Sequence, residues 1–175
     1  KEYTPDWAVI TAGAWSPILS KQTGAKLPVQ PAKGYSLSYN RVGLSIKTPM
    51  LLSEAKIGVN PVIDGIRLAG TLELTGIDSS INEKRVQAIV DGANQYLAGD
   101  SAKFEVTNVW TGMRPVTPDG LPVIDRVPDM ENLIVATGHA MLGMTMGPVT
   151  GKAVSEIVVG DHNSTDLMPL KFGRF

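Results

Sequence analysis

The sequence predicts a mixed α+β fold, because two different kinds of apolar pattern occur in it. In the middle of the chain, short apolar strands bounded by prolines precede one amphipathic helix, which is typical of a sheet covered by a helix. Nearer the end, a β-branched apolar run at 132–136 leads into a glycine-rich turn and a helix that Gly160 ends. Such a run suits a strand that is buried on both faces, so it predicts a second layer of α/β type.

The first expected strand is the apolar run at 7–12, which ends in a turn at Gly13. Since the runs at 7–12 and 132–136 both end in glycine turns, we expect them to be neighbouring strands. From Leu27 onward the chain changes character, and further short strands are expected at 29–30, 35–39 and 42–46.

A hairpin is expected where Asp64-Gly65 separates the apolar runs at 57–63 and 66–74, because this dipeptide favours a tight turn. Pro61 has no N–H to donate to a neighbouring strand. The first strand of the hairpin is therefore expected to lie at an edge or to carry a bulge.

One long helix is expected to follow, because Ser80 and Glu83 have the spacing of a capping box. Its apolar face would consist of residues at helical spacing: Val86, Ile89, Val90, Ala93 and Leu97. Gly99 would end this helix, and a strand at 103–109 would follow it. A second helix is expected to begin near Pro148, since a residue in the first turn needs no N–H.

The composition excludes several classes of protein. With 16 basic and 17 acidic residues, the net charge of -1 gives no reason to expect nucleic acid or a strongly charged membrane partner. Cysteine is absent, which excludes disulfides and thiolate catalysis within this segment. His139 and His162 lie far from any ligand spacing, so no metal site is expected. There is no transmembrane-length run and no signal peptide, so we expect a cytoplasmic location, or a peripheral one at the inner membrane face in a full-length protein.

Five motifs carry a resemblance to a known family, and they occur in that family's order. They are Val9-Ile-Thr-Ala-Gly-Ala-Trp-Ser16, Leu27-Pro-Val-Gln-Pro-Ala-Lys-Gly-Tyr-Ser36, Ala69-Gly-Thr-Leu-Glu73 with Gly76, Gly112-Met-Arg-Pro115 with Thr117-Pro-Asp-Gly-Leu-Pro122, and the glycine-rich stretch at 136–151. Together they resemble flavin-dependent amine oxidoreductases of the D-amino-acid oxidase type, bacterial D-amino-acid dehydrogenases among them. The resemblance covers about 7–160.

The resemblance implies a C-terminal fragment of a longer flavoprotein, because the family's G-x-G-x-x-G motif does not occur here. Residues 1–26 and 110–175 would be parts of a Rossmann-like FAD-binding domain, and 27–109 a substrate-binding domain. The partner would be the missing N-terminal FAD-binding segment or subunit. Without the pyrophosphate cradle of that part, the isolated chain is expected to bind FAD weakly or not at all.

Arg114 is the residue on which substrate binding is expected to depend. The proline that follows restricts its backbone, and a guanidinium can bind a carboxylate through two parallel hydrogen bonds. From the residues alone, a surface arginine paired with Asp119 or Asp125 is the simpler interpretation. The resemblance instead implies a clamp for the substrate's α-carboxylate.

The resemblance implies further site residues. The cofactor would contact Gly13, Ala14, Trp15, Gly112, Gly138, His139, Leu142, Gly143, Met144 and Thr145. The carbonyl of Met141 would face the substrate amine, and Glu73 and Tyr35 would line the substrate side. Alternatives stay open for His139, as a structural hydrogen-bonding group, and for Glu73, as a solvent-facing strand residue. The role of Tyr35 is open in the same way as that of Glu73.

The implied reaction oxidises the C–N bond of a D-amino acid, or a related amino acid, by hydride transfer to the flavin. The imino acid would then be hydrolysed to a keto acid and ammonia. No catalytic side chain is expected, since positioning and the cofactor carry such chemistry. The electron acceptor would be a quinone in a dehydrogenase, or oxygen in a glycine or sarcosine oxidase. A third hypothesis is that the isolated piece catalyses nothing.

Overall fold

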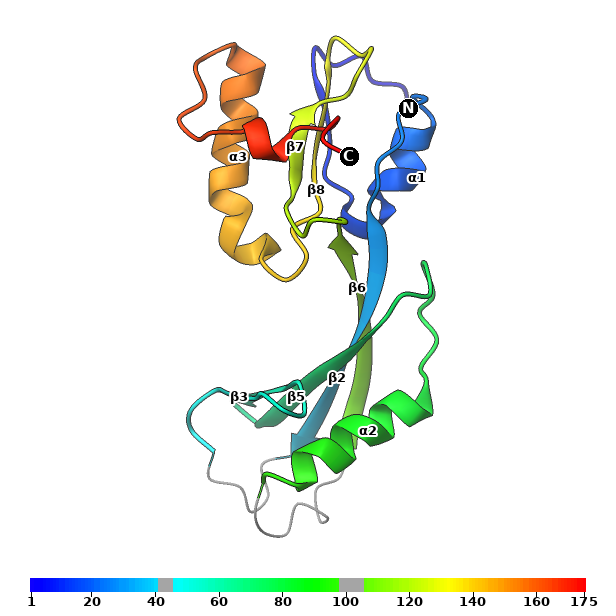
Figure 1. Ribbon diagram of the computed structural model, residues 1–175, viewed down its shortest axis with the longest axis vertical. Coiled ribbons are helices and arrows are strands. Elements are labelled where there is room, and N and C mark those ends of the chain that lie inside the picture. The colour runs from blue at the N-terminus through cyan, green and yellow to red at the C-terminus, as the bar shows by residue number, and fades with distance from the viewer. Residues whose placement is uncertain (41–45, 98–105) are drawn as a thin grey trace. The chain divides into compact units, whose positions relative to one another are not determined.

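The computed structural model describes residues 1–40, 46–97 and 106–175 (Figure 1). The chain divides into two compact units. Unit 1 consists of Lys1–Pro31 and Arg114–Phe175, and unit 2 of Ala32–Met113. Each contains its own sheet, so the mixed helix-and-strand fold class predicted from the sequence is confirmed.

The sheet of unit 1 has the strand order β1-β8-β7. The central strand β8 (Leu133–Thr137) pairs in parallel with β1 (Ala8–Ile10) and antiparallel with β7 (Val123–Arg126). Val9 lies opposite Ile134 in the parallel pair. The predicted pairing of the runs at 7–12 and 132–136 is therefore confirmed.

Both faces of β8 are covered, as its sequence predicts. On one face, α3 (Gly143–Val159) contributes Ala153 and Ile157 to a cluster with Ile124 and Ile134. On the other face, the chain around Leu27 and the later Phe172 complete a second cluster. Figure 1 shows α3 and the short α1 (Ser16–Lys21) flanking β7 and β8. Two 3-10 turns, η1 (Gly13–Trp15) and η3 (Met168–Leu170), complete the unit.

The predicted start of the last helix near Pro148 is wrong, whereas its predicted end is confirmed. The helix α3 begins at Gly143, and Pro148 lies inside it, in the second turn. A tight turn before the helix sets this start, because the N–H of Leu142 donates to the carbonyl of His139 at 2.8 Å. At the other end, Gly160 has φ +76°, a left-handed conformation that suits glycine.

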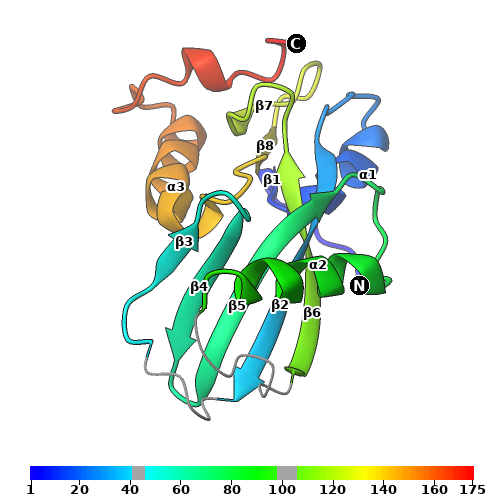
Figure 2. The same cartoon turned by 60° about the horizontal axis from the view of Figure 1, so that its bottom comes forward.

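The sheet of unit 2 has five strands in the order β3-β4-β5-β2-β6, and α2 (Glu83–Asn94) crosses it (Figure 2). The strands are β2 (Gln30–Asn40), β3 (Met50–Leu52), β4 (Ile57–Val62), β5 (Gly65–Glu73) and β6 (Val106–Val116). The two short strands expected at 29–30 and 35–39 are one continuous strand. The strand expected at 42–46 falls almost wholly outside the described residues.

The predicted hairpin is confirmed as the β4–β5 pair, but its turn consists of Ile63 and Asp64. Gly65 already pairs with Val62, and a side chain there would lie 1.9 Å from the carbonyl oxygen of Tyr39. Glycine is thus required for close approach to β2. The predicted edge position of β4 is wrong, because β3 pairs with it from Ile57 to Val59, although Pro61 lies in the last three residues, beyond that pairing.

The helix α2 packs its predicted apolar face on the sheet, with Val86, Ile89 and Ala93 buried. Its predicted cap is wrong, because Asn82 rather than Ser80 accepts a hydrogen bond from the first turn, from the N–H of Lys84. Ser80 instead donates its hydroxyl to Asp78 at 2.7 Å. The predicted end at Gly99 is wrong, because the helix already ends at Asn94 and the described residues 95–97 are not part of it. Gly99 itself and the start of the strand at 103–109 lie outside the described residues.

Candidate functional site

The turn between β8 and α3, residues 138–142, is called here the glycine turn. Gly138 has φ +84°, and a side chain there would lie 2.7 Å from the Cγ2 atom of Thr117. Both the backbone conformation and the lack of space therefore require glycine. Ala140 also has a positive φ, +47°, and its N–H donates to the carbonyl of Pro115 at 3.0 Å. The glycine turn is thus fixed between β6 and the loop that follows it.

A second turn lies beside the glycine turn. The buried hydroxyl of Thr137 donates to the carbonyl of Gly13 at 3.0 Å and accepts from the hydroxyl of Ser16 at 3.1 Å. These bonds bring the predicted cofactor residues at 13–15 next to the end of β8. Within this turn Ala14 is buried, whereas the side chain of Trp15 is about half exposed.

The first turn of α3 offers backbone donors at the surface. Its N-cap, Leu142, provides no side-chain cap, so in the described structure the N–H groups of Gly143, Met144 and Thr145 have no bond inside the chain. The side chains around them are apolar and exposed, Met144 being 94% exposed. Free N–H groups at the positive end of a helix bind electron-rich groups.

His139 connects the glycine turn to α3. Its Nε2 atom lies 2.9 Å from the hydroxyl of Thr150, and burial lowers the pKa of the imidazole. The ring is therefore neutral near pH 7, and the structural hydrogen bond considered from the sequence is present. Its contact with a cofactor stays a prediction. Thr150 had no role from the sequence, although it lies within the glycine-rich motif at 136–151.

Arg114 lies at the end of β6, and its simpler interpretation as a surface ion pair is wrong. Asp119 is bound instead by Arg174, with the Nε and Oδ2 atoms 2.7 Å apart. Asp125 accepts the N–H of Phe172 at 3.0 Å. Among the described acidic residues, none forms an ion pair with Arg114. Its guanidinium thus has the chemistry to bind an external carboxylate.

Unit 2 contains a buried polar cluster centred on Glu73. The carboxylate accepts from the Tyr35 hydroxyl, from Lys33 Nζ at 3.3 Å, from Asn82 Nδ2 at 3.0 Å and from Arg85 Nε at 3.3 Å. The Tyr35 hydroxyl contributes most to lowering the pKa of Glu73. The alternative of a solvent-facing glutamate is wrong. Since groups of the chain itself occupy both carboxylate oxygens, contact of Glu73 or Tyr35 with a substrate stays a prediction.

A β-bulge at Thr71 turns Glu73 toward this cluster. Tyr35 pairs with Gly70 and Gly34 with Leu72, so Thr71 is skipped in the ladder. Its φ of +54° is rare for a β-branched residue, and its hydroxyl accepts from Arg85 at 3.1 Å. Beyond the bulge, Leu72 is exposed and Glu73 is buried.

The cluster also contains an ion pair between Lys33 and Asp78, whose Nζ and Oδ2 atoms are 2.9 Å apart. Asp78 contributes most to raising the pKa of Lys33, and Lys33 contributes most to lowering the pKa of Asp78. The same ammonium donates to the carbonyl of Ser80 at 2.9 Å. The ion pair thus holds the segment before α2 on the sheet.

This ion pair predicts a loss of stability at both extremes of pH. The lowered pKa of Asp78 contributes stability above the ordinary aspartate pKa of about 3.9, which is lost as the pH falls through the folded-state value. The raised pKa of Lys33 contributes stability below about pH 10.4, which is lost as the pH rises through its folded-state value. The melting temperature of Asp78→Asn should therefore change less with pH than that of the parent, at both acidic and alkaline extremes. Asp64→Asn, at the exposed hairpin turn, is the matched control for the loss of one carboxylate.

Gly112 accommodates the side chain of Trp110. A side chain at this glycine would lie 2.5 Å from the indole, which is 62% exposed. The absence of a side chain at Gly112 thus leaves room for the indole ring of Trp110. The contact of this glycine with the cofactor stays a prediction.

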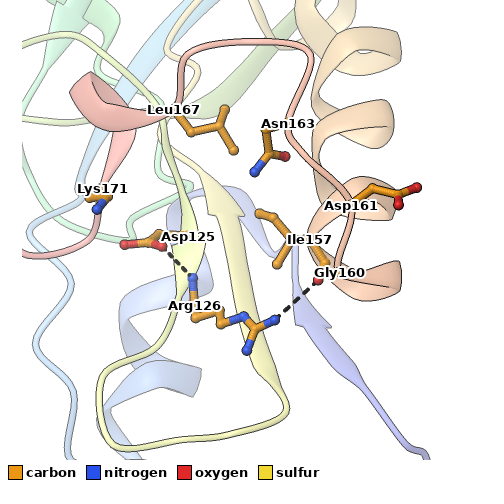
Figure 3. Close-up of a pocket in the computed structure, with 8 residues that line it drawn as sticks. All are labelled: Asp125, Arg126, Ile157, Gly160, Asp161, Asn163, Leu167 and Lys171. Carbon is orange, nitrogen blue, oxygen red and sulfur yellow. Dashed lines mark hydrogen bonds between the residues drawn. The ribbon is translucent and has the colours of Figure 1, made fainter.

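A cavity of about 300 Å³ lies at the other end of α3 (Figure 3). The residues that line it are Asp125, Arg126, Ile157, Gly160, Asp161, Asn163, Leu167 and Lys171. A 17-residue helix is about 25 Å long, so this cavity is remote from the glycine turn. Arg126 stabilises this end by donating to the carbonyl of Ile157 at 3.3 Å and lying 4.8 Å from the Trp7 ring.

Two other kinds of site are absent from the described parts of the chain. No three histidine, cysteine or acidic side chains come together there as metal ligands. Within the same ranges, no helix has both the length and the apolar character needed to span a bilayer.

Comparison with known proteins places the chain in one family, and two of its relatives share one name. Residues 1–157 match a family model described as FAD dependent oxidoreductase. The D-amino acid dehydrogenase of Vibrio atlanticus is 39% identical over 171 residues, which cover 95% of this chain and 40% of that protein. The D-amino acid dehydrogenase of Paramagnetospirillum magneticum is 36% identical over 170 residues, with 95% and 40% covered. The chain thus spans about 40% of the length of these relatives.

Solved structures show the same fold. The glycine oxidase from Geobacillus kaustophilus superposes with a TM-score of 0.89 at 27% identity, covering 99% of this chain and 46% of that protein. The iminodiacetate oxidase from Chelativorans sp. BNC1 gives a TM-score of 0.83 at 23% identity, with 97% and 46% covered.

Proposed function

Because this chain belongs to the FAD-dependent oxidoreductase family, we propose that it is the C-terminal part of a flavoenzyme that oxidises a D-amino acid. The observation that carries the proposal is the glycine turn, which begins beside a second tight turn at 13–15 and leads into the free N–H groups of α3. The 39% identity to a D-amino acid dehydrogenase supports the choice of substrate. For the tests below, the assembled enzyme means this chain together with the part of the family fold that it lacks.

The residues of unit 1 suit a flavin. The N–H groups of Gly143, Met144 and Thr145 would donate to the electron-rich edge of the ring, and the dipole of α3 would favour negative charge there. Of the other predicted cofactor contacts, Gly13, Gly138 and His139 lie around the same turns. When bound, FAD supplies the acceptor for the hydride that leaves the substrate.

Arg114 would orient the substrate. Its guanidinium would bind the α-carboxylate through two hydrogen bonds, while the carbonyl of Met141 would accept from the amine. Held in this way, the substrate presents its α-hydrogen in one direction, which is the main contribution expected from the protein. Glu73 and Tyr35 would support the substrate side through the buried cluster to which they belong.

The missing part of the fold would pack against β1. In the described sheet, β1 pairs with β8 alone, so the N–H and C=O groups along its other edge are available to a further strand. Val9 on this strand and Ile18 and Leu19 on α1 are exposed apolar residues. We propose that the FAD-binding segment present in the longer relatives covers this surface and supplies the pyrophosphate cradle.

The proposal has two versions, which differ in the electron acceptor that reoxidises the flavin. The likeness to a glycine oxidase favours oxygen, whereas the identity to D-amino acid dehydrogenases favours a quinone-type acceptor. Oxygen consumption by the assembled enzyme, compared with its reduction of a quinone, distinguishes them. A cytoplasmic location, or one at the inner membrane face, stays a prediction, as does a role in amino-acid catabolism.

The isolated 175-residue chain is expected to purify without flavin. Most polar contacts of a dinucleotide are made by its pyrophosphate, and the glycine-rich motif for that group is absent from the sequence. The visible absorption spectrum of the purified chain checks this, since bound flavin is yellow. An equimolar yellow cofactor in the isolated chain would contradict the proposal that the missing part is needed.

A further inference from the structure

Arg174 binds the loop that connects β6 to β7. Its Nε and Nη2 atoms donate to the two carboxylate oxygens of Asp119 at 2.7 and 3.0 Å. The Nη2 atom also donates to the carbonyl of Leu121 at 2.7 Å. Two parallel bonds to one carboxylate are a strong and direction-specific arrangement. The Arg174 side chain is only 13% exposed, whereas that of Asp119 is 36% exposed, so the ion pair lies at the surface with its arginine half covered by the chain.

The loop bound by Arg174 is in contact with the glycine turn. The hydroxyl of Thr117 donates to the same carbonyl of Leu121 at 2.7 Å, so two donors fix this one oxygen. The methyl group of buried Thr117 fills the space above Gly138. Movement of the loop would therefore move the glycine turn.

The same loop begins only three residues after Arg114. The last residues of β6 are fixed on one side by the bond from Ala140 to the carbonyl of Pro115, at 3.0 Å. On the other side, the loop holds them through Thr117 and Asp119. The direction of the Arg114 side chain thus depends on both attachments.

Arg174 is itself held in a fixed position. Phe172 is buried in the core of unit 1, and its N–H donates to Asp125 at 3.0 Å. The Nη1 atom of Arg174 donates to the carbonyl of Lys171 at 3.0 Å. The guanidinium is therefore held in the orientation in which it binds the loop.

We propose that Arg174 is a positioning residue for substrate binding. By fixing the loop at 117–121, it holds Arg114 and the glycine turn at a constant position relative to each other. This inference rests on the proposed function of Arg114. The family model matches residues 1–157, so Arg174 lies outside the matched part of the chain. Its effect on the substrate would pass through Asp119 and Leu121, without contact between Arg174 and the substrate.

The test compares Arg174→Gln, Arg174→Lys and Arg126→Gln in the assembled enzyme. Arg174→Gln should raise KM for a D-amino acid about tenfold while kcat changes less than about twofold, because binding geometry is lost rather than chemistry. Arg174→Lys should recover part of this loss, since it keeps the charge but not the planar fork. Arg126→Gln removes another arginine that binds the chain, at the remote end of α3, and should leave KM unchanged.

Hydrogen exchange provides the second readout. The N–H groups of Gly120 and Leu121 are bonded to the Thr117 carbonyl and to Asp119, at 3.2 and 3.0 Å. They should exchange faster in Arg174→Gln and at the parent rate in Arg126→Gln. An unchanged KM in Arg174→Gln, or the same rise in both glutamine variants, would overturn the proposal. If the parent oxidises no D-amino acid, the proposed function fails, and exchange at these two amides still decides whether Arg174 fixes the loop.

Discussion

Replacing Arg114 with leucine is expected to lower kcat/KM for a D-amino acid at least about 10²-fold in the assembled enzyme. A hydrogen bond to a charged group contributes about 1.5–3 kcal/mol, so losing two of them exceeds the roughly 2.8 kcal/mol that this factor represents. The flavin content and the melting temperature should stay close to those of the parent, because no described acidic residue pairs with Arg114. Steady-state kinetics and the visible spectrum measure these quantities.

Two comparisons make the result for Arg114 specific. Arg114→Lys should recover only part of the activity, since an ammonium keeps the charge but cannot form two parallel bonds. The matching amine that lacks a carboxylate should be oxidised equally slowly by the parent and by Arg114→Leu. Equal losses for the amino acid and the amine would show that Arg114 does not bind the carboxylate.

Replacing Gly138 with alanine should cause the largest loss of stability among single substitutions at the site. The new methyl group would lie 2.7 Å from the Cγ2 atom of Thr117, in a backbone with φ +84°. The left-handed conformation and the overpacking each cost about 1–3 kcal/mol, so we expect a loss of about 2–6 kcal/mol in unfolding free energy. Urea denaturation of the assembled enzyme measures this loss, and flavin affinity should fall with it.

Gly120 provides a matched control for this substitution. It has φ +77°, but among the described residues no atom lies within 4 Å of the place that a Cβ atom would take. Gly120→Ala should therefore show the conformational cost alone. Thr117→Ser removes the crowding methyl group and keeps the hydroxyl that donates to Leu121. Combined with Gly138→Ala, it should recover the part of the loss that exceeds the Gly120→Ala value. No recovery would show that the close contact with Thr117 is not the cause.

The parts of the fold that could be predicted from the sequence are those with a local signal. The buried strand β8 has a β-branched apolar run. Its pairing with β1 could be predicted because each of the two strands is followed by a glycine turn. The hairpin and the apolar face of α2 could also be predicted, because each depends on the spacing of residues within one short stretch of the chain.

The parts that could not be predicted depend on contacts between distant residues. Strict alternation along β5 would place Leu72 inside and Glu73 outside, but the bulge at Thr71 reverses this. Nothing local indicates that bulge, since a threonine occupies a position that usually takes glycine. Ser80 was predicted as the cap of α2 from its spacing to Glu83, but its hydroxyl binds Asp78 and does not cap the helix.

At the candidate site, the sequence suggests which residues to consider but not the contacts that hold them in place. Arg114 and the glycine turn could be located because they lie within recognisable motifs. The bond from Thr137 to Gly13, and the contact between Arg174 and Asp119, join positions more than 50 residues apart. A lone arginine near the end of the sequence carries no signal of such a contact.

The most direct test of the central proposal is anaerobic reduction of the bound flavin in the assembled enzyme by matched D- and L-amino acids. Without oxygen or another acceptor, hydride transfer from a substrate leaves the flavin reduced, so its visible absorbance disappears. We expect at least one D-amino acid to bleach the flavin and its L-enantiomer to leave the spectrum unchanged. A flavin that no D-amino acid bleaches, or that both enantiomers bleach equally, would contradict the assignment of this chain to a D-amino-acid-oxidising enzyme.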